Sequence, residues 1–373
     1  MRKFIAILLL IFNFTAAIAL IFASIAGYIS PAAFWPIALV GMAFPLLVVL
    51  NMAFMLLWII LWKKEAAISI LALLFTIWHI PKFIGFNEKE TPPNGVKKIR
   101  VMTYNVHLFN LYESENGNFK EMLEYIKSKE ADVICFQEFF TLSPTLSERK
   151  IKKHLSNYPY TYIRYTTKRK ERNAKFGVAI FSKYPIIKTR KIVFKEDTYN
   201  STIYADLHVG NDTIRVFCSH LESIKLKKDD KPHKLGERIA RNTLSTNSIK
   251  AIARKLRRAY IKRAHQVDTL KQIVESTTHP IIFCGDFNDL PNSYTYNTIK
   301  WRMIDSFTQV GHGFASTHSG LLPTMRIDFI FSDNRITAYK YSSPRVKYSD
   351  HYPVIVDFYI KKEKLQKAII RNS

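Results

Sequence analysis

The 373-residue sequence contains few cysteines, and they form no recognisable pattern. Its three cysteines, Cys135, Cys218 and Cys284, are far apart, and each lies in an apolar run typical of a strand. None shows the close Cys or His spacing of a zinc site. We therefore expect buried free thiols, assign no disulfide, and infer nothing about the cellular compartment from the cysteines.

Acidic residues are also scarce, with 30 aspartates and glutamates against 55 lysines and arginines, which gives a formal net charge of +25. Residues 1–85 contribute only +4 of this charge, from five basic residues and one acid. So basic a balance favours phosphate-bearing partners, either nucleic acid or an anionic membrane surface. Charge alone does not separate these two partners.

Charged side chains are absent from three apolar runs near the start of the chain, and we interpret residues 1–85 as a membrane anchor. Residues 4–29 are long enough to cross a bilayer as a helix. They exceed the roughly 7 to 15 apolar residues of a cleaved signal peptide, which is the alternative. Residues 36–62 and the shorter run 66–80 follow. We predict two to three transmembrane helices and favour three.

The basic residues between these runs predict the orientation of the anchor. Under the positive-inside rule, Arg2, Lys3, Lys63 and Lys64 face the cytoplasm, and three spans place the rest of the chain outside. If the third run lies in the membrane interface instead, only two spans cross and the rest of the chain faces the cytoplasm.

After a linker at residues 86–97, short apolar runs and turns indicate a separate domain over residues 98–361, followed by a basic tail at 362–373. Helices are predicted over residues 119–129 and within 244–275. Such a mixture is typical of a two-sheet α/β sandwich. Strands are predicted at residues 98–106, 131–137, 176–182, 201–209, 213–220, 280–285, 326–331 and 353–360.

Polar residues with chemical potential occur where several predicted strands end. Asn105 could bind a phosphate oxygen or cap a turn, and Glu138 could be a hard-metal ligand or a surface acid. Asp286 and Asn288, two residues apart after an apolar strand, could orient a water and hold a phosphate, although such clusters also form turns. Asp328 is costly to bury without a partner.

Taken in order, these motifs resemble the endonuclease/exonuclease/phosphatase superfamily, which includes pancreatic deoxyribonuclease, abasic-site endonucleases, inositol-polyphosphate phosphatases and bacterial sphingomyelinases. The resemblance covers about residues 98–360. It implies a four-layer α/β sandwich, with two mixed sheets flanked by helices and preceded by the transmembrane helices. It rests on Tyr104-Asn105-Val106, Gln137-Glu138, residues 177–182, Ser219-His220-Leu221, Gly285-Asp286-Phe287-Asn288, Arg326-Ile327-Asp328 and Ser349-Asp350-His351.

The resemblance also implies a metal-dependent phosphoester hydrolase. Glu138 would be the principal Mg²⁺ ligand, with Asn105 near the metal and phosphate and Asp350 as a further candidate ligand; Mn²⁺ is a possible substitute. Asp286 would orient the attacking water, and Asn288 would position the phosphate.

Two histidines complete the implied site. His351, oriented by Asp328, would contact the phosphoryl group. His220 matches the histidine that the deoxyribonuclease and sphingomyelinase branches use for leaving-group protonation, but the sequence shows no carboxylate partner for it. His312 and His318, which precede the predicted Asp328 strand, could border the substrate cleft, but loop histidines are more often incidental, and we select neither.

A strongly basic segment lies at residues 223–265, where fourteen lysines and arginines and three acids give a net charge of +11. We interpret it as part of a helix with a solvated basic face; contact with anionic lipid or a polynucleotide is the alternative. The predicted apolar helix face comprises Ile249, Ile252, Leu256, Tyr260, Ala264, Val267 and Leu270, and the predicted basic surround comprises Arg254, Lys255, Arg257, Arg258, Lys262 and Arg263.

These features favour a phosphodiesterase acting on a lipid headgroup or another extracytoplasmic phosphoester, held in a bacterial-type inner membrane. A membrane-tethered nuclease is the alternative, although the sequence lacks an aromatic-rich platform for stacking bases. A non-catalytic binding module on the same fold is the third hypothesis, and the complete motif set speaks against it.

Overall fold

Two structural units make up the computed structural model of this chain, which describes residues 2–88, 90–110, 119–169, 173–196, 199–224, 245–319 and 325–361. The helical unit comprises Met1–Ile84, Lys225–Val267 and Asp289–Thr298. The sandwich unit comprises Gly85–Ile224, Asp268–Asn288 and Ile299–Ser373. The predicted basic tail and residues 225–244 of the basic segment lie outside the described residues.

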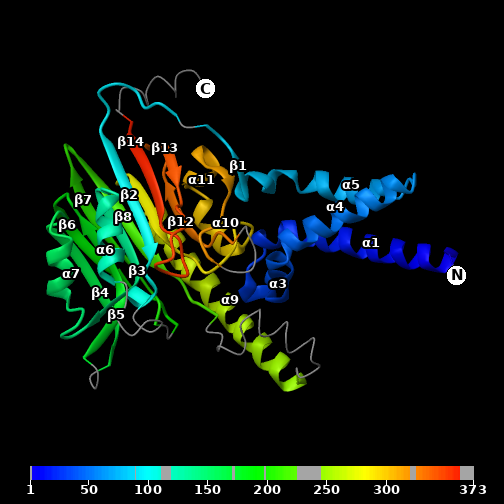
Figure 1. Cartoon of the computed structure of the whole chain (residues 1–373), viewed down its shortest axis with the longest axis horizontal. Coiled ribbons are helices and arrows are strands. Elements are labelled where there is room, and N and C mark those ends of the chain that lie inside the picture. The colour runs from blue at the N-terminus through cyan, green and yellow to red at the C-terminus, as the bar shows by residue number, and fades with distance from the viewer. Residues whose placement is uncertain are drawn as a thin grey trace. The chain divides into compact units, whose positions relative to one another are not determined.

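The sandwich unit contains two mixed six-stranded sheets, as the sequence predicted (Figure 1). Antiparallel pairs predominate, but β2–β3 and β8–β9 are parallel. The first sheet has the order β13 (Ile336–Ser342), β14 (Val354–Ile360), β2 (Lys98–Asn105), β3 (Val133–Leu142), β5 (Ala174–Ser182) and β4 (Tyr160–Arg169). The second has the order β10 (Ile304–Asp305), β12 (Asp328–Ser332), β9 (Ile281–Asp286), β8 (Asp212–His220), β7 (Ser201–Val209) and β6 (Ile186–Ile192).

The central strands are buried on both faces, which is why they read as continuous apolar runs. Side chains such as Val101 and Cys135 from the first sheet share one core with Cys218 and Cys284 from the second. On the outer face of the first sheet, the core includes residues of α6 (Phe119–Ser128) and α7 (Glu148–His154). All three cysteines are buried and free, as predicted.

Four strands that the sequence did not predict, β4, β6, β10 and β13, form the edges of the two sheets. An edge strand has a neighbour on one side only, and charged residues there discourage pairing with other chains. β6 follows this rule, because its sequence IIKTRKI is largely exposed. Edge strands of this kind lack the continuous apolar run on which the strand prediction relied. Two short strands, β1 (Ile84–Phe86) and β11 (His312–Phe314), pair separately.

Five α-helices begin the helical unit: α1 (Arg2–Ile25), α2 (Pro31–Phe34), α3 (Pro36–Met42), α4 (Phe44–Ile60) and α5 (Ala66–Phe75). Among the described residues, one helix, Lys3–Tyr28, is long and apolar enough to cross a membrane. The pair α3 and α4, bent by 58°, would supply a second crossing if counted as one span. Pro45 in the first turn of α4 accounts for the bend, because proline clashes with the preceding helical turn.

The favoured third span is not found among the described helices. α5 has only ten residues, about 15 Å of helix, whereas the apolar core of a bilayer is about 30 Å thick. Thr76 ends α5, and its hydroxyl donates to the carbonyl of Leu73 at 3.0 Å. A 3-10 helix, Ile77–Lys82, follows and contains Pro81.

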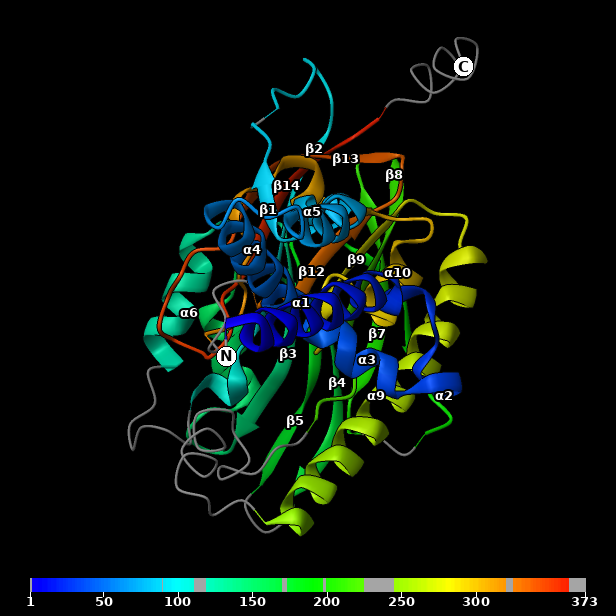
Figure 2. The ribbon, with the colours of Figure 1, turned by 90° about the vertical axis from the view of Figure 1, so that its right-hand side faces the viewer.

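Polar contacts fix the packing of α1 against α4 and α5, which lie side by side in Figure 2. The hydroxyl of Ser69 donates to Oδ1 of buried Asn13 at 2.6 Å. The amide of buried Asn51 donates to the carbonyl of Ala16 at 3.1 Å. Apolar side chains fill the space between these contacts, including Leu20 of α1 and Phe44 of α4.

The predicted helix in the basic segment is α9 (Thr246–Glu275). Its predicted apolar face is buried from Tyr260 to Leu270, whereas Ile249 at its start is 51% exposed. Arg263, predicted to lie on the basic face, is instead completely buried, and its Nε lies 3.3 Å from Oδ2 of Asp289. The reason is that Arg263 has an acidic partner inside the helical unit.

Candidate active site

Strand ends from both sheets bring the predicted site residues together. Asn105 ends β2, His220 ends β8 and Asp286 ends β9. The amide nitrogen of Asn105 donates to Oδ2 of Asp286 at 2.9 Å, and both side chains are buried. This hydrogen bond joins the first sheet to the second at the centre of the candidate site.

Glu138 reaches this centre through an irregularity in β3. The pairing of β3 with β5 shifts between Phe136 and Phe139, and Glu138 has a left-handed backbone with a φ of 51°. Such bulges redirect side chains near functional sites. Oε1 of Glu138 lies 3.4 Å from Nδ2 of Asn105 and 3.9 Å from Nε2 of His220.

The turn after β9 holds Asp286 and Asn288 as predicted from their spacing. The backbone amide of Asn288 donates to Oδ1 of Asp286 at 2.8 Å, and its side-chain amide donates to the carbonyl of Leu221 at 3.1 Å. Glycine is required before this turn, because a Cβ on Gly285 would lie 2.2 Å from the carbonyl oxygen of Ser219.

His351 and Asp328 form the predicted buried pair, with Nδ1 of the imidazole 2.9 Å from Oδ2 of the carboxylate. Burial alone would lower the pKa of His351, but the charges of Asp328 and Asp286 raise it to about 10. Burial raises the pKa of Asp328 to about 6, because the nearby charge of His351 only partly opposes the loss of solvation. The pair is therefore an imidazolium beside a carboxylate at neutral pH.

His220 has two carboxylates within reach, although the sequence showed no partner for it. Its Nε2 lies 3.6 Å from Oδ2 of Asp286 and 3.9 Å from Oε1 of Glu138. Its side chain is 13% exposed, and its Nε2 makes no hydrogen bond within the described residues. The nitrogen is thus buried beside these two acids.

Two further histidines surround Asp350, and the sequence reasoning had not selected either. Nδ1 of His107 lies 3.6 Å from Oδ1 of Asp350, and Nε2 of His318 lies 3.9 Å from its Oδ2. Burial would raise the pKa of Asp350, but His351, His107 and His318 together hold it below its usual value. His107 could have been found by its position two residues after Asn105. His318 is brought in by backbone pairing, since the amide of Ser319 donates to the carbonyl of Asp350 at 2.8 Å.

The donor set fits a hard divalent cation, which prefers carboxylate oxygen. Two groups have ligand atoms within 4.8 Å of one another: His318, Asp350 and His351, and Asp286, Asp328 and His351. Oδ1 of Asp328 is buried without a hydrogen bond within the described residues. Asn105 presents its amide nitrogen, and not its oxygen, to these acids. Its Oδ1 instead accepts a hydrogen bond from the backbone amide of His107 at 3.0 Å.

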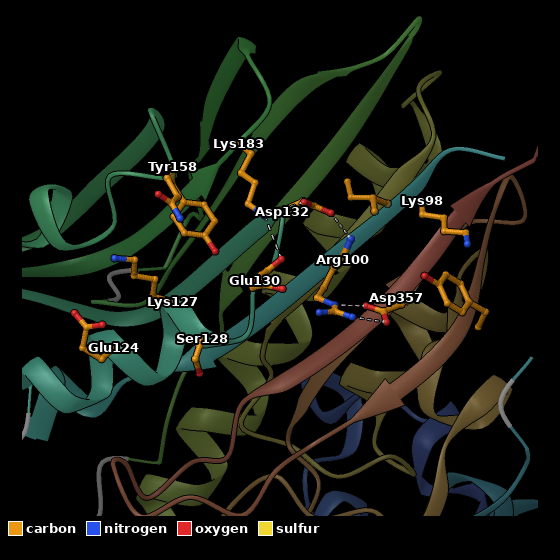
Figure 3. A pocket seen from close by; sticks show the side chains of 13 residues that line it. Lys98, Arg100, Glu124, Lys127, Ser128, Glu130, Asp132, Tyr158, Lys183 and Asp357 are labelled. Atoms are coloured by element: carbon orange, nitrogen blue, oxygen red, sulfur yellow. Dashed lines mark hydrogen bonds and ion pairs between the residues drawn. The ribbon is translucent and has the colours of Figure 1, made fainter. Parts of the chain in front are cut away.

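A separate hollow of about 710 Å³ lies among residues from the start of β2 and the loop before β3, and none of the predicted site residues lines it (Figure 3). Arg100 donates to both carboxylate oxygens of Asp357, at 2.6 and 3.0 Å. Lys183 donates to Oδ1 of Asp132 at 3.2 Å. The first of these ion pairs joins the neighbouring strands β2 and β14.

Two family models match parts of the chain. A family model described as "Endonuclease/Exonuclease/phosphatase family" matches residues 102–351, and a domain of unknown function matches residues 3–83. No curated protein is a significant match.

Two solved structures are similar to the chain in fold. The endonuclease/exonuclease/phosphatase from Beutenbergia cavernae DSM 12333 has 15% sequence identity and a TM-score of 0.52, with 71% of this chain and 72% of that one covered. The human Nocturnin catalytic domain with bound sulfate anion has 16% identity and a TM-score of 0.51, with 71% and 95% covered.

Proposed function

The chain belongs to the endonuclease/exonuclease/phosphatase family of phosphoester hydrolases, and we propose that it is a membrane-anchored, Mg²⁺-dependent phosphodiesterase. The observation that carries the proposal is the hydrogen bond from Asn105 to Asp286, around which Glu138, His220 and His351 converge. Acids and bases of different character thereby face one small volume, as hydrolysis of a phosphoester by water requires.

The proposed reaction uses these side chains in distinct roles. Asp286, fixed by Asn105 and by the amide of Asn288, orients the attacking water and accepts its proton. His351, kept protonated beside Asp328, donates a hydrogen bond to a non-bridging phosphate oxygen as charge develops there. Asn288 holds the phosphate with its side chain.

His220 protonates the leaving oxygen in this proposal. Glu138 and Asp286 lie 3.9 and 3.6 Å from its Nε2, the atom that would carry this proton. Glu138 and Asp350 would hold the divalent cation, with Asn105 beside it. When bound, Mg²⁺ neutralises charge on the phosphate, and Mn²⁺ can replace it.

We propose that the helical unit anchors the enzyme in a membrane. Large apolar side chains are exposed on its helices, for example Phe12 at 63% and Ile60 at 72%, which suits contact with lipid. Loss of α1 by cleavage would remove Asn13 and Leu20 from their packing, which favours a retained span over a signal peptide. With α5 too short to cross, two spans place the sandwich unit on the cytoplasmic side.

A reporter fused after Gly95 tests this orientation. A cytoplasmic signal supports two spans. A periplasmic signal would show that the region after α4 crosses the membrane a third time.

The proposed substrate is the phosphodiester of a lipid headgroup, because the anchor keeps the enzyme at a lipid surface. Nucleic acid is the second candidate, favoured by the net charge of +25 and by exposed arginines of α9, Arg254, Arg257 and Arg258.

The two candidates are separated by offering the full-length chain in detergent a panel of substrates with Mg²⁺ or with EDTA. The panel comprises sphingomyelin, inositol phosphates, plasmid DNA, RNA and a bis-aryl phosphodiester. Preferential, Mg²⁺-dependent release of a lipid headgroup supports the proposal. Preferential cleavage of DNA or RNA would replace the lipid substrate with nucleic acid, and hydrolysis of none would overturn the proposed function.

A further inference from the structure

The residues that directly follow the catalytic motif are held by the N-terminal helices. Segment Asp289–Thr298 begins one residue after Asn288, yet it belongs to the helical unit. Within this segment, Asn292 is completely buried, and its amide nitrogen donates to the carbonyl of Gly41 at 2.7 Å and of Ala23 at 3.4 Å. Only four peptide units separate Asn288 from this anchor point, a reach of at most about 15 Å between the Cα atoms.

The N-terminal helices leave space for this segment by means of a glycine. A Cβ on Gly27 would lie 2.5 Å from the carbonyl oxygen of Asn292 and 2.1 Å from Nδ2 of Asn297. The first of these atoms belongs to the backbone, so the segment would have to move to accommodate even alanine. The contact therefore depends on the residue at position 27 and not only on general apolar packing.

Polar contacts hold the two ends of the segment as well. At its start, Oδ2 of Asp289 accepts a hydrogen bond from the hydroxyl of Thr295 at 2.8 Å and lies 3.3 Å from Nε of Arg263. Near its end, Nζ of Lys82 donates to Oδ1 of Asn297 at 3.3 Å. Buried polar groups tolerate little displacement, because a donor or acceptor without a partner costs about 1–3 kcal/mol. The segment is accordingly held in one conformation by groups of the helical unit.

We propose that Asn292 is a positioning residue, through which the N-terminal helices fix the turn that carries Asp286 and Asn288. The proposal rests on the proposed function, since it assigns that turn to catalysis. In this arrangement the N-terminal helices set the position of a catalytic turn in addition to anchoring the enzyme. Changes in the helices are transmitted along residues 289–291, which join Asn292 to Asn288.

Asn292→Ala and Gly27→Ala test the proposal in the full-length chain in detergent, with a bis-aryl phosphodiester as the probe at saturating Mg²⁺. Displacement of a catalytic group by about 1 Å can lower the rate about 100-fold. We expect each variant to lose about 10- to 100-fold in kcat per folded molecule, with KM changed much less. Hydrogen exchange should also become faster at residues 286–290.

Asn51→Ala is the matched control. Asn51 is a buried asparagine of the same unit whose amide donates to the carbonyls of Ala16 and Leu47, at 3.1 and 2.9 Å, and not to segment Asp289–Thr298. It should lower the melting temperature to a similar extent as Asn292→Ala and leave kcat and exchange at residues 286–290 unchanged. An equal loss of kcat in Asn51→Ala would show that the loss in the other two variants comes from lower stability of the helical unit and not from the position of Asn292.

Wild-type kcat and wild-type exchange in folded Asn292→Ala and Gly27→Ala would overturn the proposal. Asn292→Ala changes the segment Asp289–Thr298, whereas Gly27→Ala changes the N-terminal helices that hold it. If one variant misfolds, the other still tests the proposal. If the wild type hydrolyses no phosphoester, the proposed function fails, whereas the exchange measurement still decides whether Asn292 fixes the turn.

Discussion

Nδ1 of His351 lies 2.9 Å from Oδ2 of Asp328, and both side chains are buried at the meeting point of the two sheets. The carboxylates of Asp328 and Asp286 raise the pKa of His351 to about 10 against the opposing effect of burial. This raised pKa keeps the imidazole protonated through neutral pH. The electrostatic role proposed for His351 therefore depends on Asp328.

Asp328→Asn should move the alkaline limit of activity to lower pH. Since the carboxylate raises the pKa of His351, its removal lets the imidazole lose its proton earlier as pH rises, by about 1 to 3 pH units. The pH dependence of kcat/KM for wild type and variant measures this shift. An alkaline limit that stays in place in the folded variant would show that another group sets it.

Removal of divalent metal should abolish hydrolysis, and added Mg²⁺ or Mn²⁺ should restore it. Glu138→Gln removes a negative ligand, so we expect the Mg²⁺ concentration for half-maximal activity to rise at least about tenfold. Titration of each protein with Mg²⁺ measures this change, and Glu124→Gln on the exposed surface of α6 is the control. Equal titration curves would exclude Glu138 as a ligand.

His220→Ala should matter most for substrates with poor leaving groups. General acid catalysis typically contributes about 100-fold or more when the departing oxygen needs a proton. We expect a loss of that size for an alkyl phosphodiester and a much smaller loss for a p-nitrophenyl diester, whose leaving group is stable without a proton. Equal losses on both substrates would remove His220 from the proton-transfer role.

The buried ion pair between Arg326 and Asp305 should stabilise the fold without taking part in catalysis. The guanidinium donates to both carboxylate oxygens of Asp305, at 3.0 and 2.7 Å, and each side chain is 1% exposed. Arg326→Met leaves a buried charge, which should lower the free energy of unfolding by about 3–5 kcal/mol.

The double variant Arg326→Met with Asp305→Asn should recover part of this loss, because the remaining partner is neutral and still able to cap the helix that begins at Ser306. Thermal unfolding of the full-length chain compares the three proteins. An Arg326→Met variant as stable as wild type would contradict the expected cost of leaving Asp305 without its partner.

The sequence predicted the central strands and the polar residues that end them, such as Asn105 and Asp286, because both depend on local signals. A buried strand is a continuous apolar run, and its end is marked by the polar residue that follows. Each motif is therefore visible within about six residues. The resemblance then supplied the spatial grouping that separate motifs do not carry.

What the sequence did not predict depends on contacts between distant segments. His318 comes close to Asp350 through backbone pairing of two loops. Arg263 is buried because it forms an ion pair with Asp289. The contact between Asn292 and Gly41 joins residues 251 positions apart and leaves no periodic signal in either segment. The expected third span stays a prediction, and hydropathy alone did not mark the end of α5 at Thr76.

The most direct test of the account is hydrolysis of a bis-aryl phosphodiester by the full-length chain, compared with Asp286→Ala and His351→Ala in Mg²⁺ and in EDTA. We predict that wild type cleaves the diester only with metal and that each variant, folded as judged by its melting curve, loses at least about 100-fold in kcat. Metal-dependent cleavage that survives both substitutions would contradict it.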